Sequence, residues 1–184
     1  SSSNNSAVVN GSGSMWTNSG RFWVGYNGPN NSLLITNGGI VADVNGRLSV
    51  AAGSTGNWAV VTGAGSMWTN SNVMRIGEGG SGNSLSILNG GWVVNSSDAS
   101  IGYNAPASNN WVLVSGAGSV WSNITSLYVG RIGSGNRLTI GNGAVVVANK
   151  FGVGQTSGGT GAVYQSGGEV RTVGDDNYLA DDTN

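Results

Sequence analysis

The chain has 184 residues, a formal net charge of −1, and neither histidine nor cysteine. The sparse charge excludes the basic surface that nucleic-acid binding requires, and the apolar runs are too short to span a bilayer. With 34 glycines, two prolines and seven tryptophans in short apolar runs, the composition indicates a folded, turn-rich β protein and not a disordered linker.

A long repeat runs through the chain. The segment at 13–18 returns at 65–70 and at 118–123, so that Trp16, Trp68 and Trp121 follow one another at steps of 52 and 53 residues. A fixed period of this size is typical of stacked repeat architectures. Each unit also splits into two similar halves, which makes the basic coil about 26 residues long.

One asparagine recurs in nearly every coil. The series is Asn31, Asn57, Asn83, Asn110 and Asn136, at steps of 26, 26, 27 and 26 residues. We expect these residues to stack in one column at a corner of the fold, where their side-chain amides can form a ladder.

Each coil contains three short strand patterns. The first alternates at Leu33/Ile35, Ala59/Val61, Leu85/Ile87, Val112/Val114 and Leu138/Ile140. After a glycine-rich corner, the second is placed at Met15, Val41, Met67, Val93, Val120 and Val145. The third alternates at Phe22/Val24, Leu48/Val50, Met74/Ile76, Ala99/Ile101, Leu127/Val129 and Phe151/Val153. Period-two spacing puts each pair on one face of a strand, so these positions are the predicted core columns.

These patterns predict an all-β fold, a parallel β-helix or β-solenoid with three short strands per coil and about seven coils. Stacking buries the apolar face that a single coil cannot bury. A propeller with four-stranded blades is the alternative, but the similarity of the two half-repeats favours the solenoid. We interpret residues 1–184 as one segment of a longer repeat protein, with an acidic end at 171–184.

The tryptophans form the candidate interaction surface. If Met67 and Val93 point inward, their tryptophan neighbours point outward, and the phase of the first strand also exposes its own tryptophans. The opposite phase would bury tryptophan in alternate coils against small residues, which fits a densely packed core poorly, so we expect an exposed surface. Its residues are Trp16, Trp68, Trp92, Trp121, Trp58 and Trp111.

Three segments carry a family resemblance: 61–68, 84–91 and 101–103. They resemble the autotransporter-associated and PEP-CTERM-associated repeats of bacterial surface and secreted proteins, and the similarity recurs over roughly residues 7–170. The resemblance implies a right-handed β-helix that serves as passenger or stalk of a large extracellular protein. It implies no catalytic residue.

The acidic residues do not form a recognisable active site. Before residue 160 they are Asp43, Glu78 and Asp98, too scattered for the paired carboxylates of polysaccharide-cleaving enzymes. A C-terminal group contains Glu169, Asp175, Asp176, Asp181 and Asp182. Such a group can bind a divalent cation, but we favour a solvated end that discourages edge pairing. We expect no enzyme activity, cofactor or metal.

The sequence therefore predicts a structural protein of the bacterial cell surface: an extracellular stalk or a self-associating filament. The alternative is a carbohydrate-binding adhesin whose exposed tryptophan and tyrosine rows contact glycans.

Overall fold

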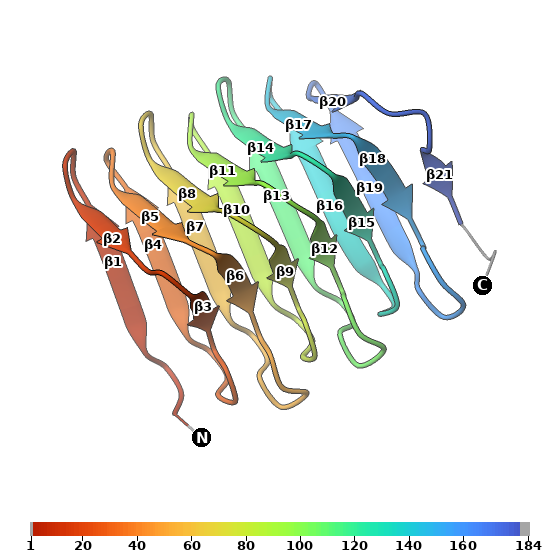
Figure 1. The fold of residues 1–184 in the computed structure, drawn as a ribbon, viewed down its shortest axis with the longest axis horizontal. Coiled ribbons are helices and arrows are strands. Elements are labelled where there is room, and N and C mark those ends of the chain that lie inside the picture. The colour runs from red at the N-terminus through yellow and green to blue at the C-terminus, as the bar shows by residue number, and fades with distance from the viewer. Residues whose placement is uncertain (1, 181–184) are drawn as a thin grey trace.

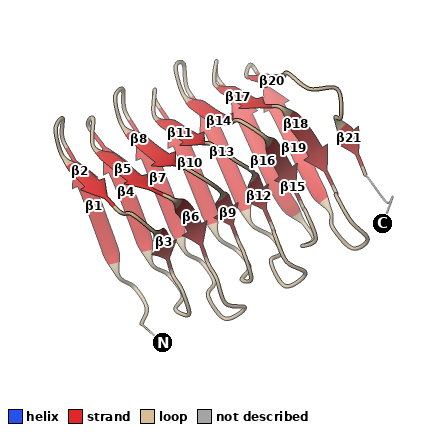
Figure 2. Cartoon of the chain, viewed as in Figure 1, coloured by secondary structure: helices blue, strands red, loops and turns tan. Residues whose placement is uncertain are grey.

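The computed structural model describes residues 2–180, and within that range the chain forms strands and no helix (Figures 1 and 2). The strands build three parallel sheets of seven strands each. Every strand between the two end coils pairs with the equivalent strand one coil before and one coil after it, as in a solenoid of seven coils. The predicted β-solenoid with three short strands per coil is confirmed.

Each sheet contains one strand from every coil, so that β1, β2 and β3 form coil 1 and β19, β20 and β21 form coil 7. Sheet 1 contains β1 (Ser6–Asn10), β4 (Ser32–Thr36), β7 (Trp58–Thr62), β10 (Ser84–Leu88), β13 (Trp111–Ser115), β16 (Asn136–Gly141) and β19 (Gly161–Ser166). Sheet 2 contains β2 (Met15–Thr17), β5 (Ile40–Asp43), β8 (Met67–Asn70), β11 (Trp92–Asn95), β14 (Val120–Asn123), β17 (Val145–Ala148) and β20 (Glu169–Thr172). Sheet 3 contains β3 (Arg21–Val24), β6 (Asn45–Leu48), β9 (Met74–Ile76), β12 (Ala99–Ile101), β15 (Ser126–Val129), β18 (Lys150–Val153) and β21 (Tyr178–Leu179).

The core lies between the three sheets, and most predicted columns are in it. Leu85, Ile87, Val93, Met74 and Ile76 are fully buried, as expected. The pair Leu48/Val50 is wrong, because Leu48 pairs in register with Val24 and Ile76 and its inward neighbour is therefore Gly46. A glycine carries no apolar side chain, so alternation in the sequence could not mark its position as part of the core.

The predicted outward orientation of Trp68 and Trp121 is also wrong, since both side chains are 0% exposed. The corner before β8 has four residues, 63–66, whereas the corner before β5 has three, 37–39. A shift of one residue turns every side chain of a strand to the other face. Trp68 consequently pairs with Val41 and Val93 in the inward column.

The other members of the second-strand pattern separate accordingly. Val41 and Val93 lie in the inward column, whereas Met15, Met67, Val120 and Val145 share the outward column with Ile40 and Trp92.

Large and small inward side chains alternate along one column of sheet 3, which contains Phe22, Gly46, Met74, Ala99 and Leu127. Coil 3 carries Trp68, and coil 2 below it carries Gly46, where an added Cβ would lie 3.0 Å from the Trp68 ring. Phe22 of coil 1 approaches the same space from the other side, with its ring centroid 6.1 Å from that of Trp68. The misfit expected for buried tryptophans therefore does not arise, and the packing unit is the 52-residue pair of coils.

The predicted asparagine column is confirmed as a continuous ladder. The backbone N–H and Nδ2 of Asn57 both donate to Oδ1 of Asn83, at 2.9 and 3.1 Å, and the same pattern recurs along the series. Asn5 adds one more step at its start. The ladder satisfies polar groups that would otherwise be buried without a partner.

A second ladder was not predicted. Asn70 donates to Asn95 at 2.8 Å and Asn95 to Asn123 at 2.6 Å, all at the inward ends of sheet 2 strands. Asp43 occupies the same column one coil earlier. The sequence carries a signal for this ladder: an asparagine follows two residues after the inward tryptophan or valine, in the segments MWTN (67–70) and WVVN (92–95).

The part of the chain that the structure describes has no helix of the length and apolar character needed to cross a membrane.

Candidate interaction surfaces

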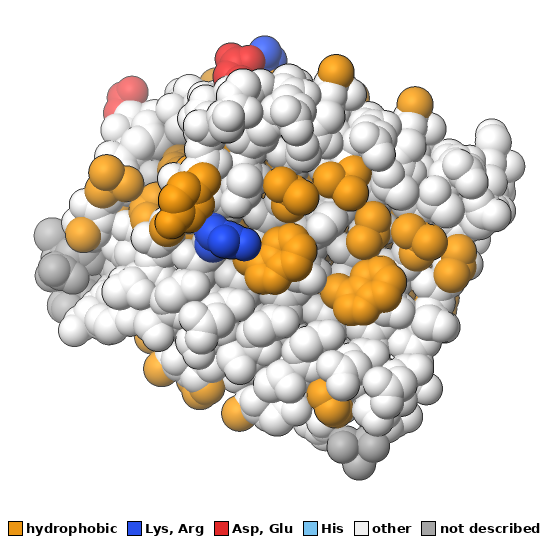
Figure 3. Space-filling view, turned by 180° about the vertical axis from the view of Figure 1, so that it is seen from behind, with side chains coloured by type: hydrophobic (Ala, Val, Ile, Leu, Met, Phe, Trp, Pro, Cys, Tyr) orange, Lys and Arg blue, Asp and Glu red, His pale blue; other side chains and the backbone are white. Residues whose placement is uncertain are grey.

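The outer side of sheet 1 combines large apolar side chains with small polar ones along the stack. Its outward central column contains Val8, Leu34, Val60, Ser86, Leu113, Thr139 and Tyr164. The neighbouring outward column contains Ser6, Ser32, Trp58, Ser84, Trp111, Arg137 and Ala162. Hydrophobic side chains gather in rows across this face (Figure 3). We call it the sheet 1 face.

The sheet 1 face is exposed and almost without charge. Val8 is 60%, Trp58 41% and Tyr164 58% exposed, and Arg137 is the single charged residue in the two columns. An exposed apolar surface of this kind marks a site of contact with another molecule.

The six tryptophans predicted to form one surface lie in four places. Trp58 and Trp111 belong to the sheet 1 face, and Trp92 is exposed on the outer side of sheet 2, where its Nε1 donates to the carbonyl of Gly118. Trp68 and Trp121 are buried in the core, so their side chains cannot contact another molecule. Trp16 has the equivalent inward position in coil 1, but it is 45% exposed at the N-terminal end of the stack.

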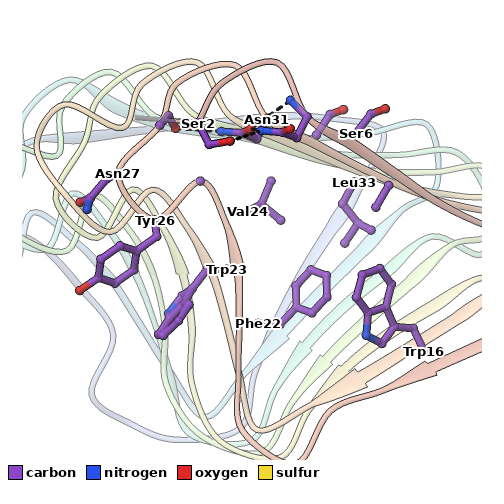
Figure 4. Close-up of a pocket in the computed structure, with 15 residues that line it drawn as sticks. Ser2, Ser6, Trp16, Phe22, Trp23, Val24, Tyr26, Asn27, Asn31 and Leu33 are labelled. Carbon is purple, nitrogen blue, oxygen red and sulfur yellow. Dashed lines mark hydrogen bonds between the residues drawn. The ribbon is translucent and has the colours of Figure 1, made fainter.

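The N-terminal end of the stack leaves part of the core uncovered (Figure 4). Trp16, Phe22 and Leu33 line a cavity there, and the rings of Trp16 and Phe22 meet edge to face at 5.0 Å. Trp23 and Tyr26 lie together at its outer side, with ring centroids 4.9 Å apart. Trp23 was not predicted as a surface residue. It lies between Phe22 and Val24, which were predicted to point inward, so its side chain must point outward.

The outer side of sheet 3 carries a row of arginine and tyrosine side chains. Glu78 accepts hydrogen bonds from Nη1 of Arg47 and of Arg75, each with a shortest distance of 2.7 Å. The Arg75 guanidinium lies 3.5 Å above the Tyr103 ring, and Arg131 approaches the same ring at 4.6 Å. We call these residues the Arg–Tyr row. The sequence hinted at it only through Arg47 and Arg75, which occupy the same outward column.

The acidic residues are separated, as the sequence suggested. Asp43 is buried and accepts a hydrogen bond from the indole of Trp68, Glu78 lies in the Arg–Tyr row, and Asp98 accepts one from Thr125. Within residues 2–180 no three acidic, histidine or cysteine side chains come together in a way that could hold a metal ion. Asp181 and Asp182 lie outside the described residues.

Comparison with protein-family models, with curated proteins and with solved structures finds no match for this chain. The resemblance to bacterial surface repeats therefore stays a prediction.

Proposed function

We propose that this chain is a structural β-solenoid of an extracellular bacterial protein, serving as a stalk or as part of a self-associating surface filament. The observation that carries the proposal is the sheet 1 face, where apolar side chains point outward in coils 1, 2, 3, 5 and 7 with a single charge between them. A contact surface that extends along the stack suits lateral association of long rods better than recognition of one small ligand.

The interior supports a structural role. Consecutive coils are joined by three parallel strand pairings, and coils 1 to 6 also by the asparagine ladder from Asn5 to Asn136. Solenoids of this kind gain stability from contacts between neighbouring repeats, so their length can grow by adding coils without a new core design.

Imaging of the purified full-length protein by negative-stain microscopy, together with a glycan array, tests this proposal. We expect elongated particles that associate side by side as the concentration rises, and no saturable glycan binding. Compact particles that degrade a polysaccharide, or saturable binding to one defined glycan, would contradict it.

A carbohydrate-binding adhesin is the second candidate, and the Arg–Tyr row favours it. The guanidinium groups of this row, held against the Tyr103 ring, can contact the acidic substituents of a glycan. This function predicts that Tyr103→Ala together with Arg131→Ala abolishes glycan retention on the array. The matched control is Trp92→Ser, an exposed aromatic on another sheet, which should leave retention unchanged.

A further inference from the structure

Large and small side chains alternate on the sheet 1 face in a way that fits a second copy of the same face. Coil 4 presents Ser84 and Ser86, and the next coil presents Trp111 and Leu113 at the paired positions. Coil 4 is therefore a shallow furrow beside the ridge of coil 5. A surface with a ridge next to a furrow of matching width can pack against itself.

The arrangement that matches ridge to furrow has a two-fold axis parallel to the strands, between coils 4 and 5. Such an axis reverses the stacking direction, so coil 4 faces coil 5 of the other copy and coil 3 faces coil 6. Trp111 of each copy then lies over Ser84 of its partner, and the contact is made twice, as in any isologous interface.

The one charge on the face fits the same register. Arg137 is in coil 6 and Trp58 in coil 3, so each Arg137 faces a Trp58 ring, a favourable cation–π pairing. A register in which coil 3 faces coil 4 of the partner also places tryptophan over serine. In that register, however, Arg137 of coil 6 faces Ser6 of coil 1. A two-fold axis along the stack instead sets coil 5 against coil 5, so that the ridge of Trp111 and Leu113 meets the same ridge and no furrow.

From these matches we propose that two copies of this chain pair through their sheet 1 faces with antiparallel solenoid axes, coil 4 of one packing on coil 5 of the other. This inference rests on the proposed structural function and names its partner as a second copy. Aligned face-to-face packing of two sheets is a common arrangement in β proteins.

The size of the contact sets the expected strength. Six facing strands at ~4.8 Å spacing and about five residues at ~3.3 Å cover roughly 500 Å² per copy. The total of about 1,000 Å² is at the lower limit for specific interfaces, so this chain alone should form a weak dimer that appears as its concentration rises.

Cysteine cross-linking tests the register, and the chain contributes no cysteine of its own. Leu34 in coil 2 should face Tyr164 in coil 7 of the partner, whereas within one chain these residues are five coils, or ~24 Å, apart. Facing sheets lie ~10 Å apart, too far for a direct disulfide, so a short bifunctional thiol-reactive cross-linker is used. Mixing a Leu34→Cys chain with a Tyr164→Cys chain in its presence should give a covalently linked heterodimer. Each variant alone should stay monomeric on a non-reducing gel.

The control replaces Leu34→Cys with Trp92→Cys, which places an exposed thiol on the outer side of sheet 2. Efficient self-linking of Leu34→Cys, or no more heterodimer than this control gives, would overturn the proposed register. Circular dichroism of each variant confirms that the solenoid is still folded.

Sedimentation equilibrium separates this inference from the function on which it rests. Trp111→Ser should weaken dimerisation by at least about tenfold, because a central tryptophan is a typical interface hot spot, and Trp92→Ser should have no effect. Assembly that depends on Trp92 and not on Trp111 would overturn this interface while leaving a self-associating structural protein. Saturable glycan binding would instead contradict the structural function itself.

Discussion

The indole Nε1 of Trp68 donates a hydrogen bond to Oδ2 of Asp43 over 2.7 Å, across coils 3 and 2 inside the stack. Asp43 stands where the second ladder would continue with an asparagine. Its Oδ1 and the Oδ1 of Asn70, its partner in register, are both buried and lack a hydrogen-bond partner. One proton on Asp43 would let it donate to Asn70 and satisfy both oxygens. Burial raises the pKa of the Asp43 carboxyl to about 6, although the hydrogen bond from Trp68 opposes the rise.

Asp43 should make stability depend on pH. Its folded pKa of about 6 lies above the ordinary value of 3.8, so the folded chain binds the proton more tightly. The resulting stabilisation is fully present below pH ~4 and is lost as the pH rises through 6, on the order of 1–2 kcal/mol after solvent screening. Urea unfolding at pH 4, 5, 6 and 7 measures it. The difference between wild type and Asp43→Asn should grow over this interval, and a constant difference would contradict the assignment.

Asp43→Asn should stabilise the protein at pH 7.5 by about 1 kcal/mol, because an amide can donate to Asn70 and still accept from Trp68. Asp43→Ala should instead destabilise by about 1–3 kcal/mol, since it leaves the buried indole N–H without an acceptor. Thermal unfolding of both variants at one pH compares them. Equal melting temperatures for the two variants would show that the ladder position contributes nothing.

Gly46→Ala should cost about 1–3 kcal/mol, because its Cβ would lie 2.3 Å from Oδ1 of Asn70 and 3.0 Å from the Trp68 ring. Gly53 is the matched control: it is exposed, and a Cβ there meets nothing within 4 Å. Chemical denaturation should show Gly53→Ala within about 0.5 kcal/mol of wild type. Similar effects at both positions would mean that the space beside Trp68 is not tightly packed.

Asn83→Ala should destabilise by about 2–4 kcal/mol, since it removes the acceptor for both the backbone N–H and the Nδ2 of Asn57. Asn72→Ala is the control, because that exposed side chain makes a single bond to Asn45. Hydrogen exchange of the Asn57 amide reports the loss directly. Unchanged protection in Asn83→Ala would argue against a structural role for the ladder.

The sequence predicted what repeats regularly and missed what depends on a single inserted residue. Asn83 and Ile87 recur at constant steps, so their column and their burial could be predicted. Trp68 could not be oriented, because its direction depends on one extra residue in the preceding corner. Gly46 offered no apolar signal, although it makes the space that Trp68 fills.

The surfaces were harder to predict than the core. The sheet 1 face joins strands about 26 residues apart, and its outward columns follow only once the register of β7, β10 and β13 is known. In the Arg–Tyr row, Arg47 and Glu78 are 31 residues apart, and no local pattern connects them.

Small-angle X-ray scattering over a concentration series tests most directly whether this chain is a self-associating structural solenoid. The particle should double in thickness with little change in length as the concentration rises. The Trp58→Ser, Trp111→Ser double variant should keep the single-copy thickness throughout. A wild-type particle of single-copy thickness at every concentration, or a double variant that thickens equally, would contradict this proposal.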